Sequence, residues 1–141
     1  MNTRLTVFAF ISLWLAGTAY PAEVPPIRAG EKPTQDSTEA ELWYGMDQAE
    51  KNIRLSPYIV HDKAPNAYVK DITCRVAGEY CPDLRLYIVD IPVFNASMAP
   101  NGVVLVFTGA LLRMQDEAEL ALVLSHEFTH YRQRHSLQGW Q

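Results

Sequence analysis

Basic residues, cysteines and long apolar runs are all scarce in this chain, and each shortage excludes a class of protein. Its 12 Lys and Arg are outnumbered by 16 Asp and Glu, and the formal charge of −4 argues against nucleic-acid binding. There is no internal repeat and no long low-complexity segment. Apolar residues make up 48% of the 141 positions and charged residues 20%. This balance is typical of a single globular domain with a real core.

The one extended apolar run lies at the N-terminus, over residues 5–19, directly after Arg4. A basic start, an apolar middle and small closing residues predict a secretory signal peptide over residues 1–19, cleaved after Ala19 or alternatively after Ala22. The run is short for a membrane span, which needs about 20 apolar residues. We therefore expect a periplasmic or secreted protein with no stable span after cleavage. An uncleaved membrane anchor is the alternative, and no cysteine near the end of the run supports a lipid anchor.

Cysteine occurs only twice, as Cys74 and Cys81, with six residues between them. In an exported chain an even count favours a disulfide between the two. The alternative is a pair of free thiols that pack as small hydrophobic side chains. Structural zinc sites use thiolate pairs two to four residues apart, together with a second pair. The chain has no second pair, so we do not expect zinc at these cysteines.

The first half of the exported chain is expected to hold a leader and two helices. Prolines crowd residues 20–37, which predicts an extended leader without regular structure. Thr38 stands three residues before Glu41, the spacing of a capping box, and a helix is expected over residues 39–55. A second, shorter helix is expected near residues 66–76.

The second half is expected to hold two strands and a longer helix. Residues 84–89 and 103–107 are rich in β-branched and aromatic side chains, which favours strands. Their connection is not helical, and this is compatible with antiparallel pairing. One or two helical turns are expected at 109–114. Asp116, followed by an acidic first turn, marks the start of a helix that runs to about residue 135 or beyond.

Histidine is scarce as well, yet three of the four histidines fall within ten residues. His126 and His130 flank Glu127 in a His-Glu-x-x-His pattern on the last helix. Residues four apart on a helix lie about 40° apart around its axis, so both imidazoles can reach one zinc ion. The carboxylate between them can take a proton from water that the metal activates. The pattern predicts metal-assisted hydrolysis; the alternative is two ordinary histidines beside a chance glutamate.

The remaining histidines give weaker signals. On a continuous helix, His135 would be turned about 500° from His130 and would lie well off the metal-binding face. We expect it to cap the helix end or to pack there, and not to be a ligand. His61 stands beside Asp62 in a proline-flanked loop and carries no specific signal.

The motif stands among further blocks whose order and spacing match one family. Together these blocks resemble the M48 family of zinc metallopeptidases, at residues 95–102, 108–112, 116–121, 126–130 and 134–136. The resemblance implies an α+β, zincin-like (gluzincin) domain over residues 38–141. It would consist of helices with a small antiparallel or mixed sheet.

The same resemblance implies roles for individual residues. His126 and His130 would bind one zinc ion, and Glu127 would be the general base that acts on water during cleavage of polypeptide substrates. The strand over 102–107 resembles an edge that pairs with an extended peptide. The substrate-binding candidates are then Asn95, Ala96, Gly102 and Val103. A strand of the sheet core fits the same five apolar residues equally well.

The resemblance also implies a third zinc ligand that this chain does not supply. Family members carry a glutamate for this purpose on a later helix, whereas this chain ends at Gln141. We expect the N-terminal, incomplete part of a zinc endopeptidase domain. Exported relatives of this kind are linked to protein quality control in the cell envelope. The alternative is a truncated, inactive relative that binds peptides or proteins.

Overall fold

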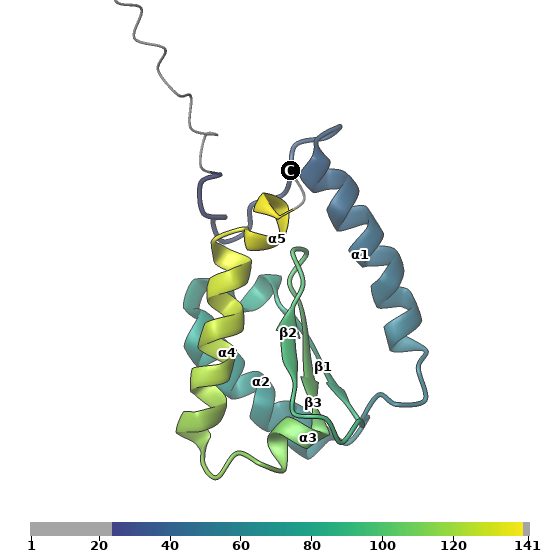
Figure 1. The fold of residues 1–141 in the computed structure, drawn as a ribbon, viewed down its shortest axis with the longest axis vertical. Coiled ribbons are helices and arrows are strands. Elements are labelled where there is room, and N and C mark those ends of the chain that lie inside the picture. The colour runs from purple at the N-terminus through teal and green to yellow at the C-terminus, as the bar shows by residue number, and fades with distance from the viewer. Residues whose placement is uncertain (1–23, 140–141) are drawn as a thin grey trace, which may run out of the picture.

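Five helices, one 3₁₀ helix and three strands make up the part of the chain that a computed structural model describes, residues 24–139 (Figure 1). The predicted signal peptide, residues 1–19, lies outside the described residues. The elements in chain order are α1 (Thr38–Arg54), α2 (Lys63–Ala77), η1 (Gly78–Asp83), β1 (Arg85–Val89), β2 (Ala96–Met98), β3 (Val103–Phe107), α3 (Thr108–Leu111), α4 (Glu117–Arg132) and α5 (His135–Gln138).

The predicted helices are present, but their ends differ from the expected ones. The side chain that caps α1 is Ser37, which accepts from the N–H of Ala40 at 3.1 Å, and not Thr38. α2 begins three residues earlier than predicted because Asp62 caps it through the N–H of Ala64, at 2.9 Å. α4 ends at Arg132, short of the expected residue 135. Caps therefore set the boundaries that apolar periodicity alone leaves open.

The three strands form one sheet in the order β1–β3–β2. β3 pairs in parallel with β1, with Arg85 opposite Val103, and antiparallel with β2, with Ser97 opposite Leu105. The predicted antiparallel pairing of the strands near 84–89 and 103–107 is therefore wrong, whereas a mixed sheet in an α+β fold is confirmed. Parallel strands need a connection that carries the chain back to the starting end. The segment around Ala96, in the connection expected to be non-helical, makes that return as β2.

The apolar core lies between the sheet and helices α2 and α4, which cover one face, while α1 lies on the other side of the sheet (Figure 1). Side chains alternate across a strand, so every second residue of β1 and β3 enters this core. The same alternation leaves Arg85, Tyr87 and Val103 on the side of α1. The core includes Val69, Ile72, Ile88, Met98, Val104, Val106, Leu120 and Leu124.

α1 is joined to the sheet by polar groups. Glu50 is only 8% exposed and accepts hydrogen bonds from Arg85 Nε at 2.9 Å and from the Tyr87 hydroxyl at 2.6 Å. The bond from Arg85 lowers the pKa of Glu50, and burial together with the Glu50 carboxylate raises the pKa of Tyr87 to about 12. Nearby, Asn101 is buried and donates to Asp47 at 2.7 Å. These pairs satisfy polar groups that burial would otherwise leave without water.

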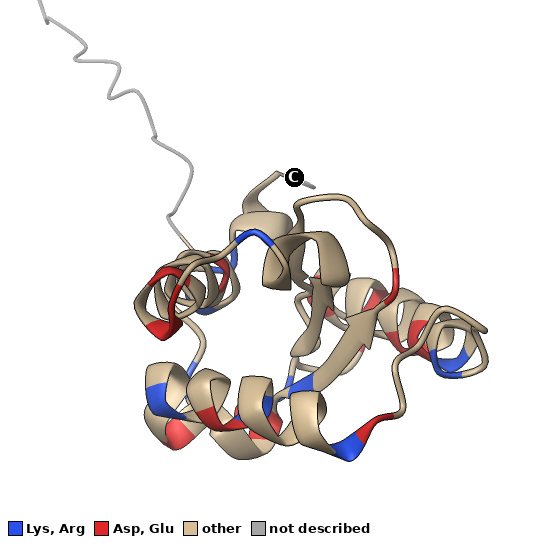
Figure 2. Ribbon diagram, turned by 90° about the horizontal axis from the view of Figure 1, so that it is seen from below, with Lys and Arg blue, Asp and Glu red and all other residues tan. Residues whose placement is uncertain are grey.

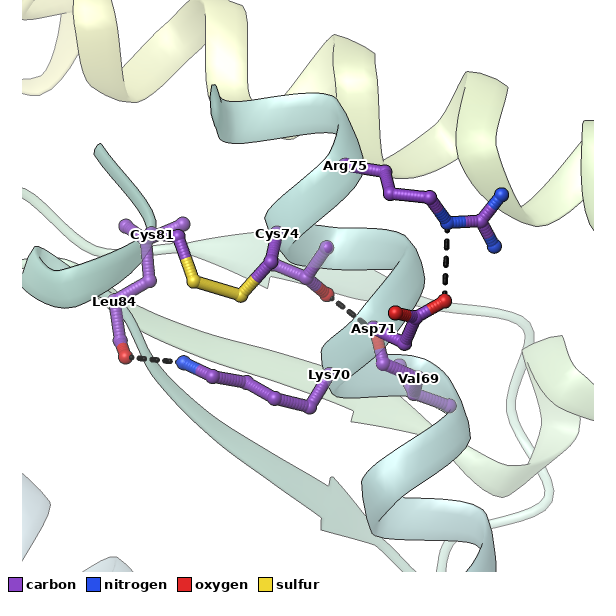
Figure 3. The surroundings of a disulfide bond; sticks show 8 residues. Val69, Lys70, Asp71, Cys74, Arg75, Cys81 and Leu84 are labelled. Carbon is purple, nitrogen blue, oxygen red and sulfur yellow. Dashed lines mark hydrogen bonds and ion pairs between the residues drawn. A yellow bond between two sulfur atoms is a disulfide. The ribbon is translucent and has the colours of Figure 1, made fainter. Parts of the chain in front are cut away.

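Cys74 and Cys81 form a disulfide, which confirms the prediction from the exported setting. The bond joins the last turn of α2 to η1, with Cα atoms 4.8 Å apart (Figure 3). On the same side of α2, Lys70 Nζ donates to the carbonyl of Leu84 at 3.0 Å (Figure 3). From another side of this helix, Arg75 pairs with Glu117 of α4 at 2.7 Å. α2 is therefore fixed both to the chain entering β1 and to α4.

Residues 24–37 pack against the domain although they form no helix or strand. The buried Ile27 donates its N–H to the carbonyl of Arg132 at 2.9 Å and accepts from the Tyr80 hydroxyl at 3.0 Å. The N–H of Gly30 donates to Asp83 at 2.7 Å. A proline-rich segment has no apolar periodicity that could predict these contacts, which come from residues about 50 and 100 positions further along.

Acidic and basic positions are interspersed over the helices, and the strands carry few charges (Figure 2). Among the residues that the structure describes, no helix is both long enough and apolar enough to cross a membrane.

Replacing Glu50 by Gln is expected to lower the free energy of unfolding at pH 7 by about 1–2 kcal/mol, because Arg85 and Tyr87 lose a charged acceptor. The larger cost of breaking a fully buried pair does not apply, since the Arg85 side chain is 38% exposed. The lowered folded-state pKa of Glu50 makes this contribution present above the ordinary value of 4.5 and lost as pH falls through the folded pKa. The difference in the free energy of unfolding between the unchanged chain and the Glu50→Gln variant should therefore become smaller in acid.

Urea unfolding of both proteins near pH 7 and near pH 3 measures this difference. The matched control is Glu41→Gln, which removes an exposed carboxylate from the same helix and should change stability by only a few tenths of a kcal/mol. A Glu50→Gln difference that is the same at both pH values would contradict the assigned role of the ion pair.

Candidate metal centre and catalytic site

The start of α4 is fixed by two side chains that bond across the first turn. Asp116 accepts from the N–H of Glu119 at 3.0 Å, and Glu119 accepts from the N–H of Gln115 at 2.8 Å. These bonds satisfy the N–H of Glu119, which the helix start leaves free, and the N–H of Gln115, just before the capping residue. They confirm the start of the helix that the acidic turn predicts.

An aromatic cluster of Tyr80, Phe128 and Tyr131 supports the C-terminal half of α4 from inside. The ring centroids of Tyr80 and Phe128 are 5.2 Å apart, and those of Tyr80 and Tyr131 are 6.5 Å apart, both edge to face. Burial raises the pKa of Tyr131 to about 12. The sequence pattern did not predict that Tyr80 and Tyr131 support the motif. The large Phe128 inside the motif could have indicated that aromatic side chains pack behind it.

With the inner face of α4 buried, His126 and His130 are left on the exposed side of the helix. Their Nε2 atoms lie 3.0 Å apart, and their ring centroids 4.6 Å apart. The prediction that the two imidazoles meet on one face is therefore correct in geometry. Zinc bound tetrahedrally through bonds of about 2.0–2.1 Å separates two ligand nitrogens by about 3.3 Å. The observed spacing is close to this value, so the pair fits two zinc ligands.

Glu127 follows His126 on α4 and is partly buried. One residue along a helix turns the side chain by about 100°, which places the carboxylate beside the histidine pair and not between the two rings. A general base needs this kind of position, close to the metal but not coordinated to it.

His135 does not lie where a continuous helix would have placed it. α4 ends at Arg132, and Arg134 adopts the left-handed conformation with φ 55° and ψ 35°. The chain therefore turns back, and His135 Nδ1 comes to 2.7 Å from His130 Nδ1. The prediction that His135 lies well away from the metal-binding face is wrong because it assumed an unbroken helix.

Within residues 24–139, no three His, Cys, Asp or Glu side chains are grouped closely enough to hold a metal ion. A catalytic zinc usually has three protein ligands, and the histidine pair would supply two of them. His135 does not complete it through Nδ1, because that atom bonds the edge of the His130 ring that faces away from His126.

The predicted substrate-binding residues fall in two places. Gly102 and Val103 are buried at the start of β3, which is the central strand, so the prediction that residues 102–107 form a sheet edge is wrong. Gly102 has φ +85°, and a Cβ there would lie 2.5 Å from the carbonyl oxygen of Asp83, so glycine is needed for this close approach. Ala96 instead begins β2 and Asn95 directly precedes it; β2 is an edge strand of the sheet and contacts α4.

Comparison with known proteins identifies the family. The model of peptidase family M48 matches residues 63–140. A putative beta-barrel assembly-enhancing protease of Vibrio cholerae is 31% identical over 120 residues, 82% of this chain and 24% of the relative. The human mitochondrial metalloendopeptidase OMA1 is 38% identical over 69 residues, 44% of this chain and 13% of the relative.

A third relative is a protease HtpX homolog of Acaryochloris marina, 32% identical over 104 residues, 71% of this chain and 35% of the relative. No solved structure matches the chain at the level of significance that these relatives reach. The chain spans about a quarter of the Vibrio protein and about a third of the Acaryochloris protein.

The matched region covers more than half of the chain and includes α2, the sheet and the His-Glu-x-x-His helix. The chain therefore belongs to peptidase family M48.

Proposed function

We propose that the chain carries the water-activating part of a zinc-dependent endopeptidase site. The observation that carries the proposal is the convergence of His126 Nε2 and His130 Nε2 at 3.0 Å on an exposed helix face, next to Glu127. Zinc held there would supply Lewis-acid activation of water and of the scissile carbonyl. Membership of the family and relatives named as metalloendopeptidases support this assignment.

The chain's own residues then divide the work. His126 and His130 would hold the metal, each through the Nε2 atom that faces the other ring. Glu127 removes a proton from the attacking water while the oxygen of that water bonds to the carbonyl carbon. Glu127 then gives the proton to the leaving amine as the C–N bond breaks.

The free edge of β2 is proposed to bind the substrate backbone. On either side of β2, the carbonyl of Asn95 accepts from the N–H of Phe107 and the N–H of Ala99 donates to the carbonyl of Val103, both in β3. Antiparallel pairs alternate, so the N–H and C=O groups of Ala96 and Met98 point to the unpaired side. An extended peptide could add there as a further strand, which gives affinity with little side-chain selectivity. This edge replaces the strand at 102–107 that the sequence predicted.

An exported setting in the bacterial envelope, periplasmic or secreted, is proposed on three grounds. The N-terminal residues 1–19 have the pattern of a signal peptide, and the name of the Vibrio relative connects that protein with β-barrel assembly. The Cys74–Cys81 disulfide fits an oxidising compartment.

Zinc binding should depend on the two motif histidines. His126→Ala and His130→Ala are each expected to weaken zinc binding at least about tenfold, because each removes one ligand. The control His61→Ala removes an exposed imidazole outside the site and should leave the affinity unchanged. Competition with a chromophoric chelator measures all four proteins. Equal affinity of the His126→Ala protein and the unchanged chain would refute the metal site.

Glu127→Gln should lower kcat for casein cleavage by about 10²-fold or more while zinc stays bound, because the amide cannot accept the proton. Glu41→Gln, a remote carboxylate removal, is the control and should retain activity. Cleavage at the same rate by the Glu127→Gln protein would rule out the general-base role. A chain that binds peptide tightly but neither holds zinc nor cleaves would favour the alternative, a peptide- or protein-binding module.

Ala96→Pro should raise KM for casein about tenfold without changing zinc affinity, because proline removes an outward N–H from an edge strand that tolerates it. Ser97→Pro is the contrasting variant, since its N–H faces β3 and its loss should lower stability instead. If Ala96→Pro changes neither KM nor kcat, the substrate does not pair with this edge.

A further inference from the structure

The histidine next to the motif makes a contact that the proposed chemistry does not yet use. His135, the first residue of α5, has its Nδ1 atom 2.7 Å from Nδ1 of His130, and the two ring centroids are 4.8 Å apart. At this distance one nitrogen carries the hydrogen and the other accepts it.

The direction of this bond matters because His130 uses its other nitrogen toward His126. Nε2 of His130 lies 3.0 Å from Nε2 of His126, on the side where the metal would be held. A histidine that binds zinc through Nε2 needs a free lone pair there, so the hydrogen of the neutral ring must sit on Nδ1. His135 Nδ1 is placed to accept that hydrogen and thereby to fix both the tautomer and the ring orientation of His130.

A strained turn holds His135 in this place. Arg134 is one of only two non-glycine residues with positive φ among the described residues, and this conformation is unfavourable for a residue with a Cβ. Its side chain is 9% exposed and forms ion pairs with Glu31 and Glu39. The pair with Glu39 joins Nε and Oε1 at 3.1 Å without hydrogen-bond alignment, and Nη1 donates to the carbonyl of Pro25 at 3.0 Å. These contacts offset the strain and fix the direction in which α5 begins.

We propose that His135 is a positioning residue, which holds His130 as an Nε2 metal ligand by accepting a hydrogen bond from His130 Nδ1. The inference rests on the proposed function, since it assigns His130 to the metal. The contacts of Arg134 with residues 25–39 keep His135 in reach. His135 itself is outside the ligand set, because its Nδ1 lies against the far edge of the His130 ring.

The test compares zinc affinity in the 141-residue chain and its variants, by competition with a chromophoric chelator. His135→Ala is expected to weaken zinc binding about 10- to 100-fold, as loss of an outer hydrogen-bond partner typically does. His135→Asn keeps an acceptor near the position of Nδ1 and should restore the affinity to within a few-fold. His61→Ala is the matched control and should bind zinc like the unchanged chain.

Two spectroscopic readouts separate positioning from coordination and from simple loss of structure. The Co²⁺ absorption spectrum of His135→Asn should match that of the unchanged chain, because the ligand set is the same. In the metal-free chain, ¹⁵N NMR should show the hydrogen of His130 on Nδ1, and His135→Ala should lose this preference. If His135→Ala does not fold, judged by near-UV circular dichroism, the unchanged chain and the Asn variant still give both readouts.

The proposal is overturned if His135→Ala binds zinc as the unchanged chain does, or if the metal-free chain carries the His130 hydrogen on Nε2. A changed Co²⁺ spectrum in His135→Asn would also overturn it, because His135 would then be a ligand. Failure of the unchanged chain to bind zinc would instead refute the proposed function, while the NMR result would still decide whether the His130–His135 bond exists.

Discussion

The face that α4 buries against α2 and the sheet determines where its histidines can point. Leu120 and Leu124, one turn apart, are almost fully buried, and burial of each contributes about 1.5–3 kcal/mol. Turning the helix by one residue would rotate it about 100°, expose part of this surface and push an imidazole toward the core. The motif therefore works as a metal site because the leucines four residues apart hold His126 and His130 on the opposite side.

Polar contacts around α4 refine this orientation but do not create it. The Arg75–Glu117 pair joins two side chains that are each about half exposed, and such pairs contribute about 0.2–1 kcal/mol. The Cys74–Cys81 bond acts on the unfolded chain more than on the folded contacts, through the closed loop. Apolar burial outweighs the ion pair, and the disulfide joins α2 to η1 and not to α4, so neither bond sets the orientation of α4.

The features that could be predicted from sequence are those encoded within a few residues. Three features of this kind are the Asp116 cap, the apolar spacing of α4 and the His126–His130 pair. Each depends on residues within about two helical turns of one another. The sheet order could not be predicted, because β3 enters between β1 and β2 through contacts that no local pattern reports. Ile27 was missed for the same reason: its partner Arg132 lies about 100 residues further along the chain.

The turn at Arg134 shows how far such long-range dependence reaches into the site. A helix that ends in a left-handed residue most often has glycine there, which would avoid the conformational cost. Glycine would also lose the bonds to Glu31 and Pro25, which precede the part of the chain that matches the family. Arg134 therefore adopts a strained backbone conformation, and its side chain links the N-terminal segment to the end of α4. The geometry at His130 is consequently supported from outside the family match, by residues whose sequence pattern carries no sign of that role.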